Sequence, residues 1–309
     1  ALSTIEGHLA LMRLLIPTGT QAADVIGLRP SAAWPHRHDR YRIGSRKDMK
    51  SAPKRHRREG FLVDFGLEVR GVSLRFGGVR ALTDVSFGIK DGELFSIIGP
   101  NGAGKTSIVN CISGRYRPTE GHLYYQCRDI TGLTPNARAS LGIGRTFQNL
   151  ALFHHMSVLD NIMVGRHHLL KNNFVTGALY WLTGARKEEL EHRHKVEEII
   201  DFLDLQSVRK APAGTLPYGL RKRVELARAM ALEPRLILLD EPMAGMNFEE
   251  KEDMARYIVD LNEEFGMTVV MIEHDMGVVM DISHRVMVLD FGRKIAEGDP
   301  AAVLADPHV

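Results

Sequence analysis

The chain has 309 residues, of which 44% are hydrophobic and 25% are charged, and its formal net charge at pH 7 is +2. These fractions are typical of a soluble globular protein with one large domain or two small ones. The sequence holds no uninterrupted apolar stretch of about 18 residues, which argues against a membrane-spanning helix, and its two cysteines fit neither a disulfide scaffold nor a zinc site.

The small net charge hides a basic segment near the start of the chain. Residues 34–60 hold ten lysines and arginines against three acidic side chains, a net charge of +7. Such a segment is able to bind nucleic acid or anionic lipid, but it shows little apolar pattern. We interpret residues 1–60 as a disordered basic extension, or as sequence upstream of a true start such as Met49, and we expect no nucleic-acid partner. The folded domain is predicted to span 61–309.

Strand patterns begin after this extension. Residues 67–74 and 81–89 alternate apolar and polar side chains, as strands with one buried face do. A turn signal, Asp91-Gly92, precedes the apolar run Leu94–Ile98. The continuous hydrophobicity of that run predicts a fully buried strand.

The residues after this strand predict a phosphate-binding loop. The segment from Gly99 to Thr106 has the pattern G-x-x-x-x-G-K-T and is followed by an apolar helical pattern. A strand, a glycine-rich turn and a helix in this order point main-chain N–H groups and the positive end of a helix dipole at one place. In such loops the lysine reaches the β- and γ-phosphates and the threonine hydroxyl ligates Mg²⁺. We therefore predict a nucleoside triphosphate site made by nine consecutive residues: Gly99, Pro100, Asn101, Gly102, Ala103, Gly104, Lys105, Thr106 and Ser107.

Beyond this loop the pattern changes to helices and then returns to strands. Residues from about 149 to 230 are expected to form an inserted helical block, with an amphipathic helix at 187–205. A helix at 249–265 then alternates with buried strands. Alternation of this kind predicts a parallel sheet with helices on its faces. The predicted strands of this part are 236–239, 268–272 and 285–289.

Two carboxylates, Asp240 and Glu241, stand at the end of the predicted strand 236–239. Transfer of a phosphoryl group to water requires residues that hold the metal, neutralise developing charge and orient the nucleophile. Asp240 is suited to holding Mg²⁺, and Glu241 is suited to polarising the attacking water. Alone, such a pair is common at strand ends; beside a phosphate loop, it predicts hydrolysis of the triphosphate.

Five segments stand in the order found in ATP-binding-cassette ATPases. They are the phosphate loop, Arg145-Thr-Phe-Gln148, Leu216-Pro-Tyr-Gly219, Leu239-Asp-Glu-Pro242 and Glu273-His-Asp275. The chain resembles this superfamily over about residues 66–305. Within it, the chain is similar to the ATPase subunits of branched-chain amino acid importers, through Gly142–Leu150, Met156–Asn161, Ala244–Asn247 and Ile272–Met276. The resemblance implies an α/β fold of the P-loop NTPase type, with a mixed sheet around a parallel core, an antiparallel β subdomain and an inserted helical subdomain.

The resemblance also implies roles for single residues. Phe76 would stack on the adenine ring, although a lone Phe after a strand is more often part of a core. Gln148 would contact Mg²⁺ and the attacking water and would sense a membrane partner. His274 would contact the γ-phosphate and stabilise the transition state. The loop 244–247 would cross to a second subunit, and it ends here in Asn247 where the family commonly has Asp.

The signature segment departs most from the superfamily. Its common form is Leu-Ser-Gly-Gly-Gln, whereas this chain has Leu-Pro217-Tyr218-Gly219-Leu. The resemblance implies that this segment binds the γ-phosphate held by the opposite subunit. Pro217 removes a hydroxyl and an N–H donor, while the N–H groups of Tyr218 and Gly219 and the helix dipole remain. The change is either a neutral subfamily variant or the cause of a slower composite site.

The resemblance implies the ATPase subunit of an importer, at the cytoplasmic face of the plasma membrane. The resemblance implies a head-to-tail dimer with a second ATPase subunit, identical or different, that binds two ATP-Mg²⁺. It further implies a separate transmembrane permease and, indirectly, a solute-binding protein. Phe153, His154 and Met156 are candidates for contacting the permease, although they fit a core equally well. Three alternatives stay open: the ATPase of a lipid or lipopolysaccharide exporter, a soluble ABC ATPase without transport, and an inactive regulatory subunit.

Overall fold

The computed structural model describes residues 65–146, 151–169, 185–307 and 309. Contacts divide the chain into residues 1–45 and residues 46–309, and every described residue belongs to the second unit. The predicted extension 1–60 and Gln148 lie outside the described residues.

An antiparallel sheet opens the described chain. Its strands are β1 (Phe65–Phe76), β2 (Val79–Lys90), β4 (Glu120–Tyr125) and β5 (Arg128–Asp129), and within the described residues their order is β2-β1-β4-β5. β1 pairs with β2 on one side and with β4 on the other. The alternating segments 67–74 and 81–89 lie inside β1 and β2, so these two strand predictions are confirmed.

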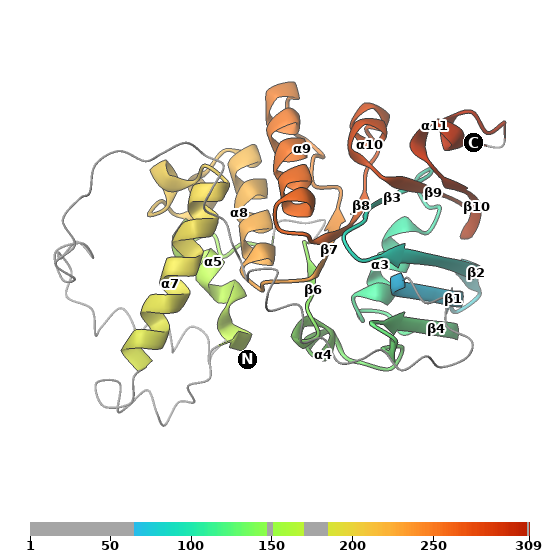
Figure 1. Ribbon diagram of the computed structural model, residues 1–309, viewed down its shortest axis with the longest axis horizontal. Coiled ribbons are helices and arrows are strands. Elements are labelled where there is room, and N and C mark those ends of the chain that lie inside the picture. The colour runs from blue at the N-terminus through green and yellow to red at the C-terminus, as the bar shows by residue number, and fades with distance from the viewer. Residues whose placement is uncertain (1–64, 147–150, 170–184, 308) are drawn as a thin grey trace. The chain divides into compact units, whose positions relative to one another are not determined.

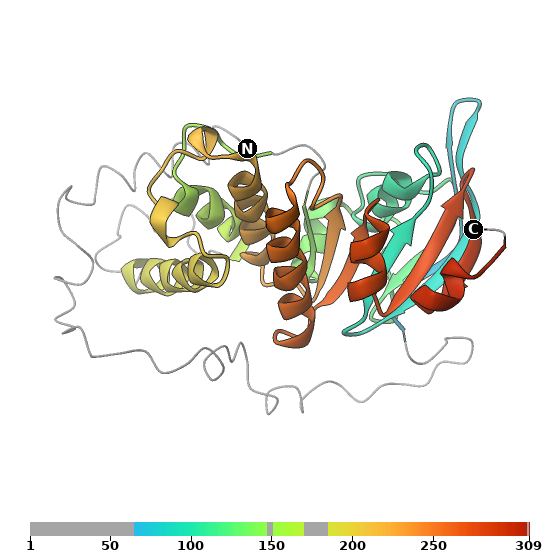
Figure 2. The same cartoon turned by 90° about the horizontal axis from the view of Figure 1, so that it is seen from above.

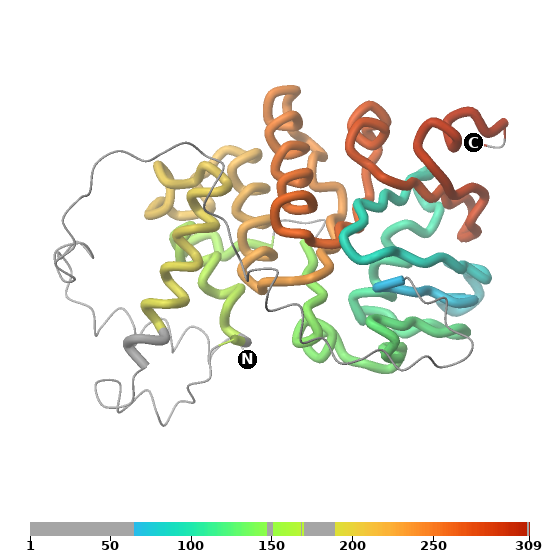
Figure 3. Tube along the Cα trace, in the orientation of Figure 1, coloured from blue at the N-terminus to red at the C-terminus, as the bar shows by residue number. Residues whose placement is uncertain are grey.

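A second sheet contains the predicted buried strands. Among the described residues its order is β10-β9-β3-β8-β7-β6, and only the β9–β10 pair is antiparallel. β3, from the phosphate-loop region, lies between β8 and β9 from the last quarter of the chain (Figure 3). The strands are β3 (Leu94–Ile98), β6 (Ile143–Arg145), β7 (Leu236–Asp240), β8 (Thr268–Ile272), β9 (Arg285–Asp290) and β10 (Arg293–Gly298).

Helices cover this sheet and form a separate block beside it. The sheet-associated helices are α3 (Lys105–Ile112), α4 (Pro135–Ser140), α9 (Phe248–Glu263), α10 (Met276–Ile282) and α11 (Pro300–Leu304). Figures 1 and 2 show the other helices together beyond β6 and β7. These are α5 (Val158–Gly165), α7 (Ala185–Phe202) and α8 (Tyr218–Met230), with 3₁₀ turns at His167–Leu169, Gln206–Val208 and Ala213–Thr215.

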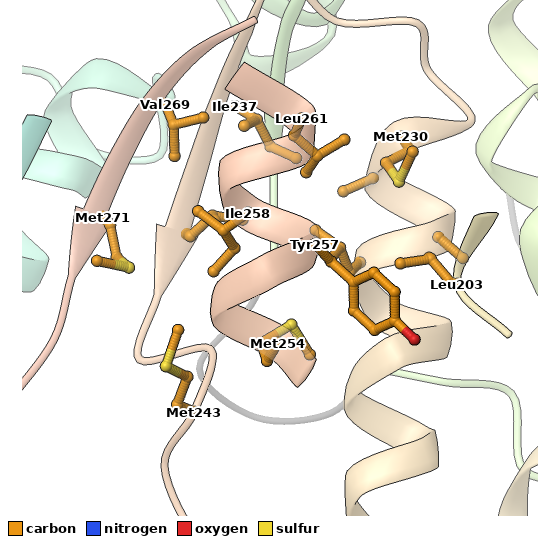
Figure 4. Packing of buried hydrophobic residues seen from close by; sticks show 14 of the residues in the cluster. Leu203, Met230, Ile237, Met243, Met254, Tyr257, Ile258, Leu261, Val269 and Met271 are labelled. Atoms are coloured by element: carbon orange, nitrogen blue, oxygen red, sulfur yellow. The ribbon is translucent and has the colours of Figure 1, made fainter. Parts of the chain in front are cut away.

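The larger core joins the sheet to this helical block. α9 places Met254, Ile258 and Leu261 on one face at helical spacing, and all three are buried. Figure 4 shows α9 lying between the strands of Ile237 and Val269 and the helix of Met230. Each fully buried aliphatic side chain of this kind stabilises the fold by about 1.5–3 kcal/mol. The carboxyl ends of β7 and β8 therefore rest on a packed support.

Candidate active site

The phosphate loop turns between β3 and α3, where two positions require glycine. Gly104 is the residue before α3 and has φ 101°, and a Cβ there would lie 2.7 Å from the carbonyl oxygen of Ala81. Gly99 has φ 141°, and a Cβ there would lie 2.0 Å from the carbonyl oxygen of Leu289. Only glycine adopts these angles and allows this close approach of backbones. The glycines of the pattern thus fix the path of the loop.

Lys105 turns its ammonium back into the loop. Its Nζ donates to the carbonyl oxygens of Gly99 at 2.7 Å and Pro100 at 2.9 Å. Burial lowers the pKa of this ammonium, and the carboxylates of Glu241 and Asp240 oppose that shift. The lysine charge is therefore held at the centre of the loop, facing the two carboxylates.

A cavity of about 240 Å³ lies in front of the loop. It brings Glu241, which is distant in sequence, beside the first turn of α3. Among the predicted residues that do not line it, Ala103 is buried, and its carbonyl oxygen accepts from the N–H of Gly292 at 2.9 Å. The lining residues are Ala81, Asn101, Gly102, Gly104, Lys105, Thr106, Ser107 and Glu241.

Asp240 ends β7 with a fully buried carboxylate. Its Oδ2 accepts from Arg145 Nη2 at 3.1 Å, whereas its buried Oδ1 has no hydrogen-bond partner among the described residues. Burial raises the pKa of the Asp240 carboxyl, and Arg145 opposes that shift. A buried carboxylate oxygen without a donor matches the hard oxygen ligand that Mg²⁺ prefers. The site residues therefore fit a magnesium ion.

Arg145 belongs to the site although the sequence assigned it no role. It ends β6, which pairs with β7, and its Nη1 donates to Asn110 Oδ1 at 2.6 Å and to Ser113 Oγ at 2.8 Å. Arg145 thus ties Asp240 to α3. Its place directly before the expected metal-contacting segment, on a strand beside β7, is the signal that would have identified it.

Glu241 and His274 are in direct contact at the edge of the second sheet. His274 Nε2 lies 2.7 Å from Glu241 Oε1. Glu241 has φ 51°, uncommon for a residue with a side chain, and its N–H donates to the carbonyl oxygen of Ile272 at 3.0 Å. Because β7 and β8 are parallel neighbours, the residues that follow them meet at one edge of the sheet. The structure therefore brings these two predicted residues together.

Phe76 lies at the end of β1 and is 46% exposed. Its ring meets the ring of Tyr116 edge to face, with centroids 5.1 Å apart. Phe76 does not line the cavity. The exposed part of this ring is available for contact with a ligand.

The signature segment does not contribute to the lining of this chain's own cavity. Pro217 is the cap residue of α8, which begins at Tyr218. The Tyr218 ring packs against Gly245, and Gly219 packs against Glu250. Neither Pro217, Tyr218 nor Gly219 lines the cavity.

Lys222, on the same helix, reaches the residue that follows β7. It is buried, and its Nζ donates to the carbonyl oxygen of Glu241 at 3.3 Å and lies 3.9 Å from the Glu225 carboxylate. Sequence reasoning missed this contact. A lysine among the residues of a buried helix face is the pattern that signals this contact.

None of the helices in the described part of the chain is long and apolar enough to cross a membrane.

The family model described as ABC transporter matches residues 82–244. The high-affinity branched-chain amino acid transport ATP-binding protein BraF of Pseudomonas aeruginosa is 39% identical over 79% of this chain and 95% of its own length. Its counterpart LivG of Escherichia coli is 36% identical with the same coverage.

Solved structures give the same result. An ATP-binding cassette of an ABC transporter in its ADP conformation matches with a TM-score of 0.69 and 32% identity, over 80% of this chain and 96% of that one. A dimeric bacterial ABC transporter cassette matches with a TM-score of 0.65 and 26% identity, over 76% and 98%. With the phosphate loop, the carboxylate pair and the mixed sheet in place, the chain belongs to the ATP-binding cassette family of ABC transporter ATPases.

Proposed function

We propose that this chain is the ATP-hydrolysing subunit of an importer for branched-chain amino acids. The observation that carries the proposal is the cavity between the phosphate loop and Glu241, with His274 bonded to that glutamate. The names of BraF and LivG supply the substrate class. They favour amino acid import over lipid export and over a soluble ATPase without transport.

The phosphate loop binds the triphosphate in this proposal. Main-chain N–H groups from Gly99 to Ser107 surround the phosphates, and the Lys105 ammonium leaves its two carbonyl partners to contact the β- and γ-phosphates. Phe76 stacks on the adenine ring. A bound Mg²⁺ would neutralise charge on the phosphates, held by the Thr106 hydroxyl, Asp240 and Gln148.

Hydrolysis then requires one proton transfer. The Glu241 carboxylate accepts a proton from the attacking water while the water oxygen bonds to the γ-phosphorus and the bond to the β-phosphate oxygen breaks. His274 holds Glu241 through their 2.7 Å contact and stabilises charge on the γ-phosphate. ADP and inorganic phosphate are the products.

Neighbouring subunits complete the proposed transporter. The signature segment Pro217–Gly219 lies outside its own cavity, which supports a head-to-tail dimer in which it binds the partner's γ-phosphate. The transporter cassettes among the relatives support a permease partner, contacted near Phe153, His154 and Met156, a solute-binding protein, and a position at the cytoplasmic face of the membrane.

The transport proposal is tested on the native complex. We would tag the full chain, purify it with its permease, and reconstitute the complex into liposomes that contain ATP and Mg²⁺, with the solute-binding protein supplied outside. We expect ATP-dependent accumulation of labelled leucine, abolished in the Glu241→Gln complex. A complex that extracts lipid, or hydrolyses ATP without moving any branched-chain amino acid, would contradict the proposal.

A further inference from the structure

Three consecutive residues after β8 contact the segment that follows β7. Glu273 accepts a hydrogen bond from the N–H of Met243, and His274 contacts Glu241. Asp275 Oδ2 accepts from Nζ of Lys251, on α9, at 2.7 Å. The two segments therefore meet at three successive points at the carboxyl edge of the sheet. Of the three residues, only Glu273 is buried.

Both oxygens of the Glu273 carboxylate accept a main-chain hydrogen bond. Oε1 accepts from the N–H of Met243 at 2.8 Å, and Oε2 accepts from the N–H of His274 at 3.0 Å. The side chain is 3% exposed. A carboxylate is an acceptor at both oxygens, whereas a carboxamide of the same shape would turn an NH₂ donor toward one of these N–H groups. The position therefore requires an acidic side chain.

Met243, whose N–H donates to Glu273, is itself fixed in place. The Met243 side chain is buried in the larger core, where Figure 4 shows it beside Met254 and Met271. Met243 follows Glu241 by two residues and begins the loop that continues to Asn247. Glu241 is held at its N–H by Ile272 and at its carbonyl by Lys222. The Met243 bond adds the contact that sets the distance of this segment from His274.

We propose that Glu273 is a positioning residue for hydrolysis, which sets the geometry of the Glu241–His274 pair and transmits displacement of the loop 243–247 to His274. The inference rests on the roles proposed above for Glu241 and His274. Glu273 touches neither the cavity nor the reacting atoms, and it acts through the two main chains that it joins.

The test is Glu273→Gln in the full chain, with Glu263→Gln on the exposed side of α9 as the matched control. We expect kcat to fall about 10- to 100-fold, because a small misplacement of a catalytic group has effects of that size. ATP affinity stays within about twofold of wild type, because the phosphate loop is untouched. The ring resonances of His274 in NMR spectra shift in the Gln variant and not in the control.

A second variant and a double mutant make the result decisive. Glu273→Asp keeps the charge but is too short to span both N–H groups, and we expect it to lower kcat with ATP binding retained. In a His274→Ala background, Glu273→Gln causes little further loss if it acts through His274, and the losses multiply if the two act independently. Unchanged kcat, multiplied losses, or loss of ATP binding in both Glu273 variants would overturn the proposal. A wild-type chain that does not hydrolyse ATP would instead overturn the proposed function.

Discussion

Asp240 is one buried side chain that links the stability of the fold to the proposed metal site. One of its oxygens is held by Arg145, and the other is buried without a donor among the described residues. Burial raises its pKa above the unfolded value despite Arg145. The fold therefore favours the neutral form, and the ionised carboxylate lowers the free energy of unfolding at pH values above the folded pKa. This loss of stability disappears at pH values below the pKa that Asp240 has in the unfolded chain.

We predict that Asp240→Asn raises the melting temperature of the protein at pH 7 in the absence of metal and nucleotide. The gain shrinks as the pH falls toward about 4, where the wild-type carboxyl also becomes neutral. Thermal unfolding in EDTA measures it, with the exposed Asp281→Asn as the control. The same variant loses Mg²⁺-dependent hydrolysis. A lower melting temperature for Asp240→Asn would contradict this account of the site.

Arg145 orients Asp240 from β6, so its loss is expected to weaken metal binding. We predict that Arg145→Met raises the Mg²⁺ concentration for half-maximal hydrolysis by about 10- to 100-fold, the usual effect of losing a residue that orients a metal ligand. Binding of ATP measured in EDTA stays unchanged. A Mg²⁺ titration of ATPase activity tests this prediction. If Arg145→Met leaves the Mg²⁺ concentration for half-maximal hydrolysis unchanged, Arg145 has no part in the metal site.

Some site residues are evident from the sequence and others are not. The phosphate loop and the Asp240–Glu241 pair are contiguous, so their spacing alone predicts them. Arg145 contacts Asp240 across 95 residues and Lys222 contacts Glu241 across 19. These contacts depend on which strands pair and on how α8 packs, and neither is encoded in local spacing.

At the scale of elements, continuous apolar runs predicted the buried strands well. The run 268–272 matches β8 at both ends, and 236–239 falls one residue short of β7. β6 has three residues, and β10 is an edge strand with mostly exposed or half-buried side chains. Both strands, and β4, escaped prediction because they lack the alternation or the length that signals a strand.

The N-terminus of α8 permits a direct test of the altered signature. Pro217 precedes the helix with φ −51° and ψ 155° and provides no side-chain cap. Serine is favoured in such a position and restores both the missing hydroxyl and the missing N–H. We predict that Pro217→Ser raises the free energy of unfolding by about 1 kcal/mol and raises ATP turnover by up to about 100-fold where the composite site is formed.

Denaturant unfolding and steady-state ATPase assays measure the two effects separately. Pro217→Ala restores the N–H without the hydroxyl and serves as the matched control. A Ser variant with the added stability but unchanged turnover would show that Pro217 is a neutral variant of the signature.

At the scale of the whole molecule, we propose that the cavity is half of a composite site. The phosphate loop and Glu241 meet at this cavity, whereas none of the signature residues Pro217, Tyr218 and Gly219 lines it. The loop up to Asn247 is fixed at its far end by the capping box of α9, where Asn247 Oδ1 accepts from Glu250 at 2.9 Å. Asn247 therefore caps the helix with a side-chain oxygen, as an Asp at this position is also able to do. This arrangement predicts that ATP joins two subunits and that hydrolysis separates them.

The most direct test of this account is the oligomeric state of Glu241→Gln with ATP and Mg²⁺, measured by light scattering coupled to size-exclusion chromatography. Loss of the general base is expected to lower turnover on the order of 10²- to 10⁴-fold while ATP binding remains. The account predicts a stable species of twice the monomer mass that holds ATP, with wild type returning to monomer as ATP is consumed. A variant that stays monomeric with ATP bound, or one that hydrolyses ATP at the wild-type rate, would contradict it.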